Sequence, residues 1–277
     1  MQIYTNGLGA NSGDTLVTCE ALQVSGNVWW CNSTTGVDAG SPQGLDREAP
    51  LLTIAQAMAN AALGDIIVLQ NGFTETCVAP LACRAGITLV GEGSSGGQPT
   101  RSLINNQAAG EILSVSAVGV EIRNIKFPAN LQVNASAKII VTNHNSRIIG
   151  CYFEGGPHDH AAQVQYGVAA DWTCQVVRNT TFISVAPTCA DRPYTGIYIP
   201  RGNNYMTLDG VTFDDGPFGW NVDYAFYGMA AASLYFRMIG VSLLHGASMY
   251  MNGTVAGTSL GWLNVQTRTG GGRVNWP

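Results

Sequence analysis

Acidic side chains and one histidine recur just after similar short segments in the second half of the chain. Asp214 and Asp215 follow LDGVTF directly, Glu154 follows IIGCYF, and His245 follows MIGVSL after one intervening residue. Two carboxyl groups that flank a glycosidic bond can cleave it, one as general acid and the other as base or nucleophile. Asp159 lies between two histidines, but an HDH triplet matches no known metal-binding spacing. These residues are candidates for a sugar-cleaving site, and we expect no bound metal or other cofactor.

The simpler interpretation of these residues is polar turn chemistry. Asp214 and Asp215 precede Gly216, and aspartates in turns commonly accept hydrogen bonds from nearby backbone amides. If the two aspartates are instead extended, they point to opposite sides of the chain. We therefore assign no catalytic residue, and a non-enzymatic protein is the preferred interpretation.

The segments that position these acids repeat. Their final residues, four phenylalanines and one leucine, are separated by 26, 29, 31 and 30 positions, which is too regular for chance. The repeated segments are IRNIKF (122–127), IIGCYF (148–153), VRNTTF (177–182), LDGVTF (208–213) and MIGVSL (238–243).

Each segment predicts two short strands joined by a bend. Inward residues of a strand lie two apart, but the apolar residues Ile122, Ile125 and Phe127 are spaced three and then two. One residue must therefore lie in the bend. That position holds only asparagine or glycine, the residues that best tolerate left-handed backbone conformation. The bend residues are Asn124, Gly150, Asn179, Gly210 and Gly240.

A third short β-like run lies about fifteen residues before each final residue of the repeats. Three strands per unit of about 30 residues predict an all-β fold, a single-stranded parallel β-helix in which each coil covers the last. A β-sandwich is the alternative, but it would need tight hairpins that the spacing does not provide. The third runs are EILSVS, AKIIVT, YGVAA, GIYIP and DYAFYG.

An amphipathic helix is expected over about 53–63, with Gly64 at its C-cap, before the strand DIIVLQ. Such a helix suits the exposed end of a stack of coils, although any packed surface helix has the same pattern. We expect an N-terminal arm over 1–26 and a β-helix over 27–277 with coils over about 65–267.

The predicted register also sets distances between the candidate acids. Glu154 and Asp214 occupy the same position two coils apart, or roughly 10 Å. That is slightly beyond the ~6.5 to 9.5 Å of an inverting glycosidase. Asp215 and His245 lie on neighbouring coils. The loop that contains Asp159 (155–163) is expected to be an insertion.

Basic and aromatic side chains suggest two further hypotheses. A lyase would need an arginine or lysine base near calcium-binding carboxylates, but Arg178 and Asp209 on adjacent coils are more simply an ion pair. Trp220, Tyr224 and Tyr227 crowd one segment, where they could contact another subunit or stack on a glycan. We favour the subunit contact.

Composition excludes several partners and locations. Lysine occurs only as Lys126 and Lys138 and the net charge is −5, so we expect neither nucleic acid nor an anionic membrane as a partner. No basic and apolar leader and no run of 18 apolar residues is present, so we expect no signal peptide and no membrane span. The seven cysteines are odd in number, which favours reduced core thiols.

The segment WWCNSTTGVDAGSPQGLDREAPLLTIAQAMANAALGDIIVLQNGFTE (29–75) resembles the opening of right-handed parallel β-helix proteins of the pectin-lyase-like superfamily. With the repeats, the resemblance covers roughly 27–267. It is specific for the fold but not for a function, because the superfamily includes pectinases, lyases, phage tailspikes and non-catalytic virion proteins. A chain that opens this way without a secretion signal looks like tailed-bacteriophage proteins. The matching residues are Trp30, Gly36, Asp38, Gly40, Pro50, Thr53, Ile54, Ala57, Gly64, Asp65, Ile67, Val68, Gly72 and Glu75.

The resemblance implies a function in a virion that is assembled in the host cytoplasm, with the arm over 1–26 as a possible virion attachment. The leading hypothesis is a non-enzymatic capsid decoration or cement protein, or a short fibre or spike, that binds other virion proteins as a homotrimer. The alternative is a tailspike-like polysaccharide depolymerase, a glycoside hydrolase or lyase acting on host surface polysaccharide. A glycan-binding module is the third hypothesis.

Overall fold

The computed structural model describes fourteen stretches of the chain. They are 26–38, 43–93, 102–106, 110–129, 134–155, 160–167, 173–184, 195–201, 204–214, 226–228, 234–244, 249–251, 261–268 and 274–275. The expected N-terminal arm therefore lies outside the described residues, apart from Gly26.

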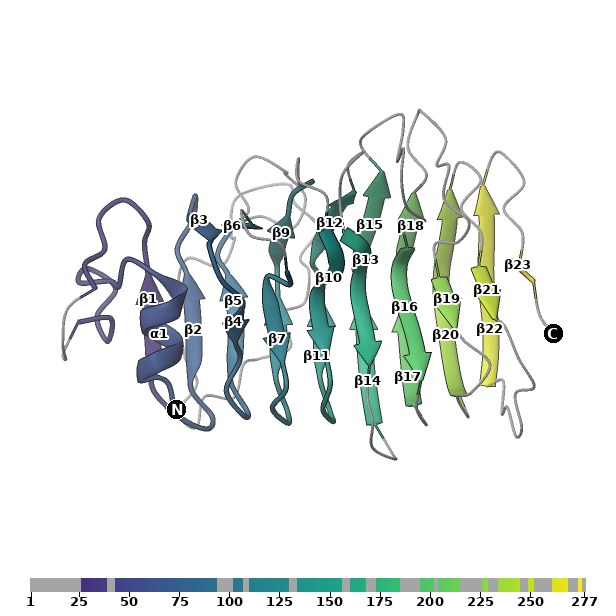
Figure 1. Cartoon of the computed structure of the whole chain (residues 1–277), viewed down its shortest axis with the longest axis horizontal. Helices are drawn as coiled ribbons and strands as arrows, with labels where there is room; N and C mark the ends of the chain where they lie inside the picture. Colours follow the sequence, from purple (N-terminus) through teal and green to yellow (C-terminus); the bar gives the residue numbers. More distant parts are fainter. Residues whose placement is uncertain are drawn as a thin grey trace, which may run out of the picture.

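The strands stack in parallel into a solenoid, with the helix α1 (Ile54–Asn60) at the N-terminal end (Figure 1). Each coil, meaning one turn of the solenoid, adds strands to three faces. The first face contains β1 (Val28–Cys31), β2 (Ile66–Leu69), β5 (Thr88–Gly91), β8 (Glu121–Arg123), β11 (Arg147–Ile149), β14 (Thr173–Arg178), β17 (Asn204–Asp209) and the first parts of β20 (Leu234–Leu244) and β22 (Gly261–Arg268).

The other two faces complete each coil. The second face contains β3 (Thr74–Cys77), β6 (Ser102–Asn106), β9 (Ile125–Phe127), β12 (Tyr152–Gly155), β15 (Thr181–Ser184), β18 (Thr212–Asp214) and the ends of β20 and β22. The third face contains β4 (Leu81–Ala82), β7 (Leu113–Val115), β10 (Asn134–Val141), β13 (His160–Gly167), β16 (Thr195–Arg201), β19 (Phe226–Gly228), β21 (Met249–Met251) and β23 (Val274–Asn275). The fold class expected from the sequence, a parallel β-helix, is confirmed.

The bend between the first and second faces has the predicted left-handed conformation. Asn124 and Asn179 have φ of 52° and 48°, and Gly150, Gly210 and Gly240 have φ of 63°, 62° and 59°. The bend lets the residues before and after it both point inward. It also lets β20 pair with β17 before Gly240 and with β18 after it.

A column of aromatic rings follows the bends inside the solenoid. Here a column means residues paired in register on consecutive coils. The rings of Phe127 and Phe153 are 4.7 Å apart and 8° from parallel, and those of Phe153 and Phe182 are 4.9 Å apart. Phe213 continues the stack at 5.1 Å, and Leu243 pairs with it on the next coil. The predicted inward set is therefore the core of the second face.

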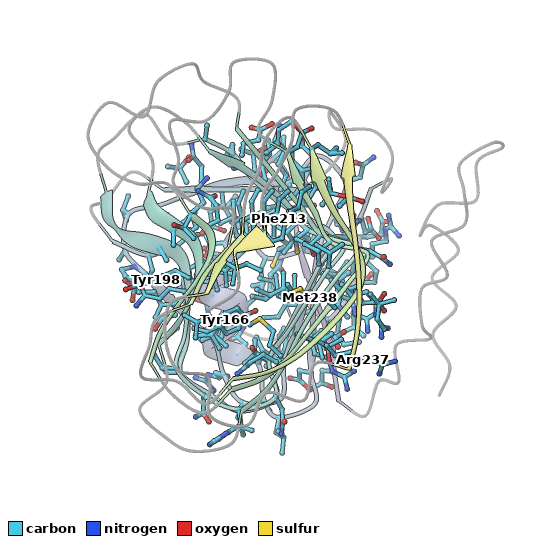
Figure 2. All side chains as sticks on the ribbon, turned by 90° about the vertical axis from the view of Figure 1, so that its right-hand side faces the viewer. Tyr166, Tyr198, Phe213, Arg237 and Met238 are labelled. Carbon is cyan, nitrogen blue, oxygen red and sulfur yellow. The ribbon has the colours of Figure 1, made fainter. Side chains whose placement is uncertain are left out.

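The residues labelled in Figure 2 separate the inside of the coil from its surface. Tyr166, Phe213 and Met238 point inward, and each is at most 2% exposed. Tyr198 and Arg237 lie on the outer side of the coil. Alternation along each strand thus places one side chain in the core and the next on the outer surface of the solenoid.

Two local predictions were wrong. The helix ends at Asn60, not 63, and its C-cap is the extended residue Ala61 rather than Gly64. The reason is Asp65, whose carboxylate accepts a hydrogen bond from the Ala62 amide at 2.8 Å and turns the chain toward β2. The segment 155–163 is not one inserted loop, because Gly155 ends β12 and 160–163 begin β13. Of the strand predicted at YGVAA (166–170), Tyr166 and Gly167 end β13, and residues 168–170 lie outside the described residues.

Four cysteines are free and buried in the described residues, as expected. Burial raises the pKa of Cys83 to about 12, and burial together with the nearby Glu75 charge raises that of Cys77 to about 12. Burial also raises the pKa of Cys31. These thiols stay protonated at neutral pH and act as core side chains. No helix in the described part of the chain is long and apolar enough to cross a bilayer.

Candidate functional site

Three acids in the segment 29–75 form hydrogen bonds around α1, the helix that caps the N-terminal end of the solenoid. Oδ1 of Asp38 accepts hydrogen bonds from the amides of Leu52 and Thr53 at 2.9 and 3.0 Å. Its Oδ2 accepts one from the Thr53 hydroxyl at 2.6 Å. Thr53 is the N-cap of α1, and its side chain accepts from the Gln56 amide. Asp38 therefore holds the residue that starts the helix.

Two more acids from the same segment secure the cap from other sides. Oε2 of Glu75 accepts a hydrogen bond from the Ile54 amide at 2.7 Å, and burial raises the pKa of Glu75 despite this bond. Asp65 is 2% exposed and accepts hydrogen bonds from the Trp29 indole and the Asn27 amide at 2.8 and 2.6 Å. Three acids of the matched pattern are thus used to join the helix and β1 to the first coils.

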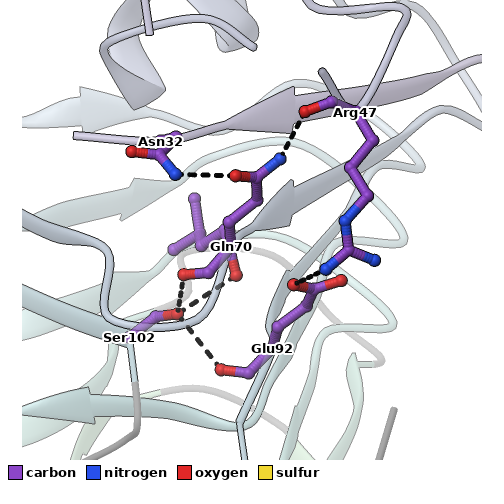
Figure 3. A network of polar contacts seen from close by, with 6 residues as sticks. Asn32, Arg47, Gln70, Glu92 and Ser102 are labelled. Carbon is purple, nitrogen blue, oxygen red and sulfur yellow. Dashed lines mark hydrogen bonds and ion pairs between the residues drawn. The ribbon is translucent and has the colours of Figure 1, made fainter. Parts of the chain in front are cut away.

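A polar network at the edge of the first face holds a buried acid (Figure 3). Glu92, with a side chain 3% exposed, pairs with Arg47 at 3.0 Å. Burial raises the pKa of Glu92, and the Arg47 charge opposes this rise. The Gln70 amide accepts a hydrogen bond from Asn32 and donates one to the Arg47 carbonyl, both at 2.7 Å. The Ser102 hydroxyl lies 3.4 Å from the Glu92 carbonyl. This network ties the loop before α1 to the coils.

The predicted acid column exists, but its acids do not meet. Glu154 pairs in register with Ile183, and Ile183 pairs with Asp214 on the next coil. Two coil spacings correspond to roughly 10 Å. Glu154 forms an ion pair with Lys126 at 2.6 Å, and the Lys126 ammonium also lies 5.7 Å from the centre of the Tyr152 ring. The register prediction is correct, but the sequence analysis missed the ion pair that Lys126 forms with Glu154.

Most other candidates lie outside the described residues. These are Asp159, Asp215, His245, Trp220 and Tyr224. The backbone of Tyr227 lies in β19 and pairs with Tyr198, but its side chain is also outside the description. Within the described stretches, no group of three or more His, Cys, Asp or Glu residues could hold a metal ion.

A buried lysine forms hydrogen bonds to the backbone of two neighbouring coils. Lys138 in β10 is 0% exposed, and its ammonium donates to the backbone carbonyls of Pro128 and Glu154 at 2.7 and 2.5 Å. Pro128 directly follows β9, and Glu154 belongs to β12, the neighbouring strand of the second face. The sequence analysis noted Lys138 only as one of two lysines. Its burial could not be predicted, because it depends on how the second and third faces pack against each other.

Charged side chains line the outer side of the first face. Glu121 lies beside Arg123 on β8, with which it forms an ion pair, and 3.7 Å from Arg147 on the next coil. Arg178 and Asp209 form the predicted ion pair across adjacent coils at 3.1 Å. These charged side chains lie on successive strands of the first face, from β8 to β17.

Stacked parallel coils, an inward aromatic column and an N-terminal helix define a parallel β-helix protein. Within this class, a family model described as "Protein of unknown function (DUF1565)" matches residues 34–208, more than half of the chain. The chain belongs to this family. The search of curated proteins found no match.

Solved structures with similar backbones include two lyases and a phage protein. A rhamnogalacturonan lyase has a TM-score of 0.48 at 11% identity, over 89% of this chain and 62% of its own length. The pectate lyase Pel9A has a TM-score of 0.45 at 11% identity, over 91% and 78%. Geobacillus virus E2 ORF18 has a TM-score of 0.28 at 9% identity, over 76% and 53%. The chain thus spans less than two thirds of the rhamnogalacturonan lyase.

Proposed function

We propose that the chain is a non-enzymatic structural protein of a bacteriophage virion, either a capsid decoration or cement protein or a short fibre or spike. The observation that carries the proposal is that acids in the described residues form ion pairs and hydrogen bonds within the fold. Glu154 of the predicted column is paired with Lys126, and Asp38 is bonded to the start of α1. A carboxylate held in this way supports the fold and is poorly placed to exchange a proton with a substrate.

The function would be mechanical. Each coil is hydrogen-bonded to its neighbours along three faces, and the phenylalanine column runs through four consecutive coils. Because each repeat is stabilised by its neighbours, such a solenoid resists local opening except near its ends. The cap of α1 and residues 43–51 protects the N-terminal end. A rigid body of this kind suits a decoration or spike that is assembled in the host cytoplasm as a homotrimer.

A degradation assay tests the non-enzymatic part of the proposal. Purified protein is incubated with acidic and neutral polysaccharides from the surface of the bacterial host, and released reducing ends and unsaturated sugars are measured. We expect no release by the wild type or by the variants Asp214→Asn and Asp215→Asn. Release by the wild type that Asp214→Asn or Asp215→Asn abolishes, while the variant keeps its folded circular-dichroism spectrum, would overturn the proposal in favour of a depolymerase.

Light scattering coupled to gel filtration tests the assembly. We expect a mass of three chains. A monomer at all concentrations contradicts the trimer. Deletion of 1–26 tests the arm: the truncated protein should still form trimers but should no longer attach to virions, and unchanged attachment would exclude an attachment role for the arm.

A further inference from the structure

The outer side of the first face carries two adjacent columns of side chains. The first column runs through Glu121, Arg147, Val176, Thr207 and Arg237, which pair in register from β8 to β20. The second runs through Arg123, Ile149, Arg178, Asp209 and Ile239 on the same strands. We call the four arginines of these columns, with Glu121 and Asp209, the arginine ladder.

The arginine ladder is a basic surface on an acidic protein. It has four positive and two negative side chains, a local charge of +2, whereas the whole chain has a net charge of −5. Arg147 is 55% exposed, Arg178 is 35% exposed, and Arg237 is also exposed. Figure 2 shows Arg237 on the outer side of the coil. The guanidinium groups of these three residues are therefore accessible to a ligand, whereas Arg123, at 14% exposure, is largely covered.

The acids in the ladder position the arginines more than they neutralise them. The buried carboxylate of Glu121 contacts Arg123 and lies 3.7 Å from Arg147, so one acid is shared by two guanidinium groups. Asp209 is 32% exposed and contacts Arg178 at 3.1 Å. A guanidinium that is already held by a neighbour loses less conformational entropy when it binds a ligand.

The spacing suits a linear polymer that runs along the solenoid axis. Neighbouring coils are about 4.8 Å apart, so Arg123 and Arg178 are separated by roughly 10 Å, and Arg147 and Arg237 by roughly 14 Å. A ligand with a repeating acidic group can meet successive arginines of this array. A small anion would engage only one position.

We propose that the arginine ladder binds an acidic polysaccharide that carries carboxylate groups along its length. Guanidinium groups bind carboxylates through paired hydrogen bonds, and the exposed Asp209 can accept hydrogen bonds from sugar hydroxyls. A mixed array of donors and acceptors therefore matches a ligand that has both carboxylates and hydroxyls. Single-stranded DNA fits less well, because its deoxyribose backbone has no 2′-hydroxyl groups to donate hydrogen bonds to Asp209. Binding requires no cleavage and does not depend on a virion role.

Binding measurements on the whole chain test the ladder. Alginate serves as the acidic probe, dextran as the neutral probe and single-stranded DNA as the phosphate probe, in low and physiological salt. We expect alginate to bind and dextran not to bind, with DNA weaker than alginate and with all ionic binding reduced by salt. The double variant Arg147→Gln with Arg237→Gln should weaken alginate binding by about tenfold, the effect of losing roughly 1.4 kcal/mol.

Arg84→Gln is the control variant, because Arg84 lies outside the ladder and donates a hydrogen bond to the Ala61 carbonyl near the cap. It should leave alginate binding within about twofold of the wild type. Equal binding of dextran, tighter binding of DNA than of alginate, no alginate binding at low salt, or equal losses in the ladder and control variants would each overturn the proposal. The variants are compared at matched circular-dichroism spectra, so that unfolding does not imitate lost binding.

Discussion

The ammonium group of Lys126 lies 2.6 Å from a carboxylate oxygen of Glu154, and the two residues belong to adjacent strands of the second face, β9 and β12. Both side chains are largely buried, at 16% and 14% exposure. An acid that the repeat pattern marks as a catalytic candidate is therefore a bond between coils.

A double-mutant cycle measures this bond. Glu154→Gln leaves a mostly buried ammonium without its charged partner, so we expect it to lower the free energy of unfolding by roughly 1–3 kcal/mol, between the values of surface and buried ion pairs. Lys126→Met should behave similarly. The double variant should lose less than the sum of the two losses, by about 1 kcal/mol, in urea unfolding followed by circular dichroism.

Asp214 provides the control for this cycle, because it shares the column of Glu154 but lies two coils from it. The losses from Lys126→Met and Asp214→Asn should add within about 0.5 kcal/mol. Additive losses for Lys126 and Glu154 as well would contradict a direct bond between them.

The left-handed bends permit a matched pair of substitutions. Gly150→Ala places a methyl group in open space, 3.9 Å from its nearest neighbour, so only the backbone conformation is penalised, by about 1–2 kcal/mol. At Gly210 the same methyl group would lie 2.5 Å from Oδ1 of Asn179. Gly210→Ala should therefore be more destabilising by about 0.5–1.5 kcal/mol, because the Asn179 side chain must leave its rotamer.

A second substitution at Asn179 checks this explanation. In an Asn179→Gly background the two alanine variants should cost the same, within about 0.5 kcal/mol, when thermal or urea unfolding is measured. A persistent excess for Gly210→Ala would show that something other than Asn179 opposes the methyl group.

The aromatic column should dominate the stability of the middle coils. Phe153 is 0% exposed and stacks between Phe127 and Phe182. Phe153→Ala should cost about 3–5 kcal/mol, and Phe153→Leu less than about 2, since Leu243 occupies the equivalent position later in the chain. The outward substitution Thr212→Ala should change the free energy of unfolding by less than about 0.5 kcal/mol. Comparable losses for Phe153→Ala and Thr212→Ala would exclude a stacked core at this position.

The Glu75 carboxyl group predicts a pH dependence of stability. Burial raises its pKa in the folded state from the ordinary value of 4.5. Between the unfolded and folded pKa values the native protein binds more protons than the unfolded chain, so the free energy of unfolding falls as the pH rises through this window. Glu75→Gln keeps an acceptor for the Ile54 amide but has no charge to bury.

The measurement compares the wild type with Glu75→Gln in urea unfolding from about pH 4.5 to 8, a range that begins near the pKa of an unfolded glutamate. The wild type should lose stability relative to the variant as the pH rises, and the difference should level off above the folded pKa. A difference that grows in favour of the wild type with rising pH would mean that the charged carboxylate is stabilising.

Much of the fold could be predicted from the sequence because the bend leaves a local signature. Asn124, Gly150 and their equivalents recur at one position beside a fixed apolar pattern, and left-handed conformation restricts the residue types that fit there. The helix end could not be read in the same way. Gly64 resembles a C-cap, but the stop is set by Asp65, which is also bonded to the distant residues Asn27 and Trp29.

The candidate site was less predictable because it depends on which side chains meet across coils. Glu154 and Asp214 were correctly placed in one column. The Lys126 contact was missed because the lysine belongs to the neighbouring column and reaches Glu154 only through its long side chain. Arg147 and Arg237 are 90 positions apart in the sequence, and only the lengths of the intervening coils bring them into one column.

The composition of purified phage particles tests the central claim most directly. Particles produced from the genome that carries the gene are purified on a density gradient, analysed by mass spectrometry and labelled with gold-conjugated antibodies raised against the β-helix. The account predicts that the chain copurifies with the particles and that the label lies at regular positions on the capsid or tail. Its absence from intact, infectious particles, with the protein found only in the soluble fraction of the lysate, would contradict a structural role in the virion.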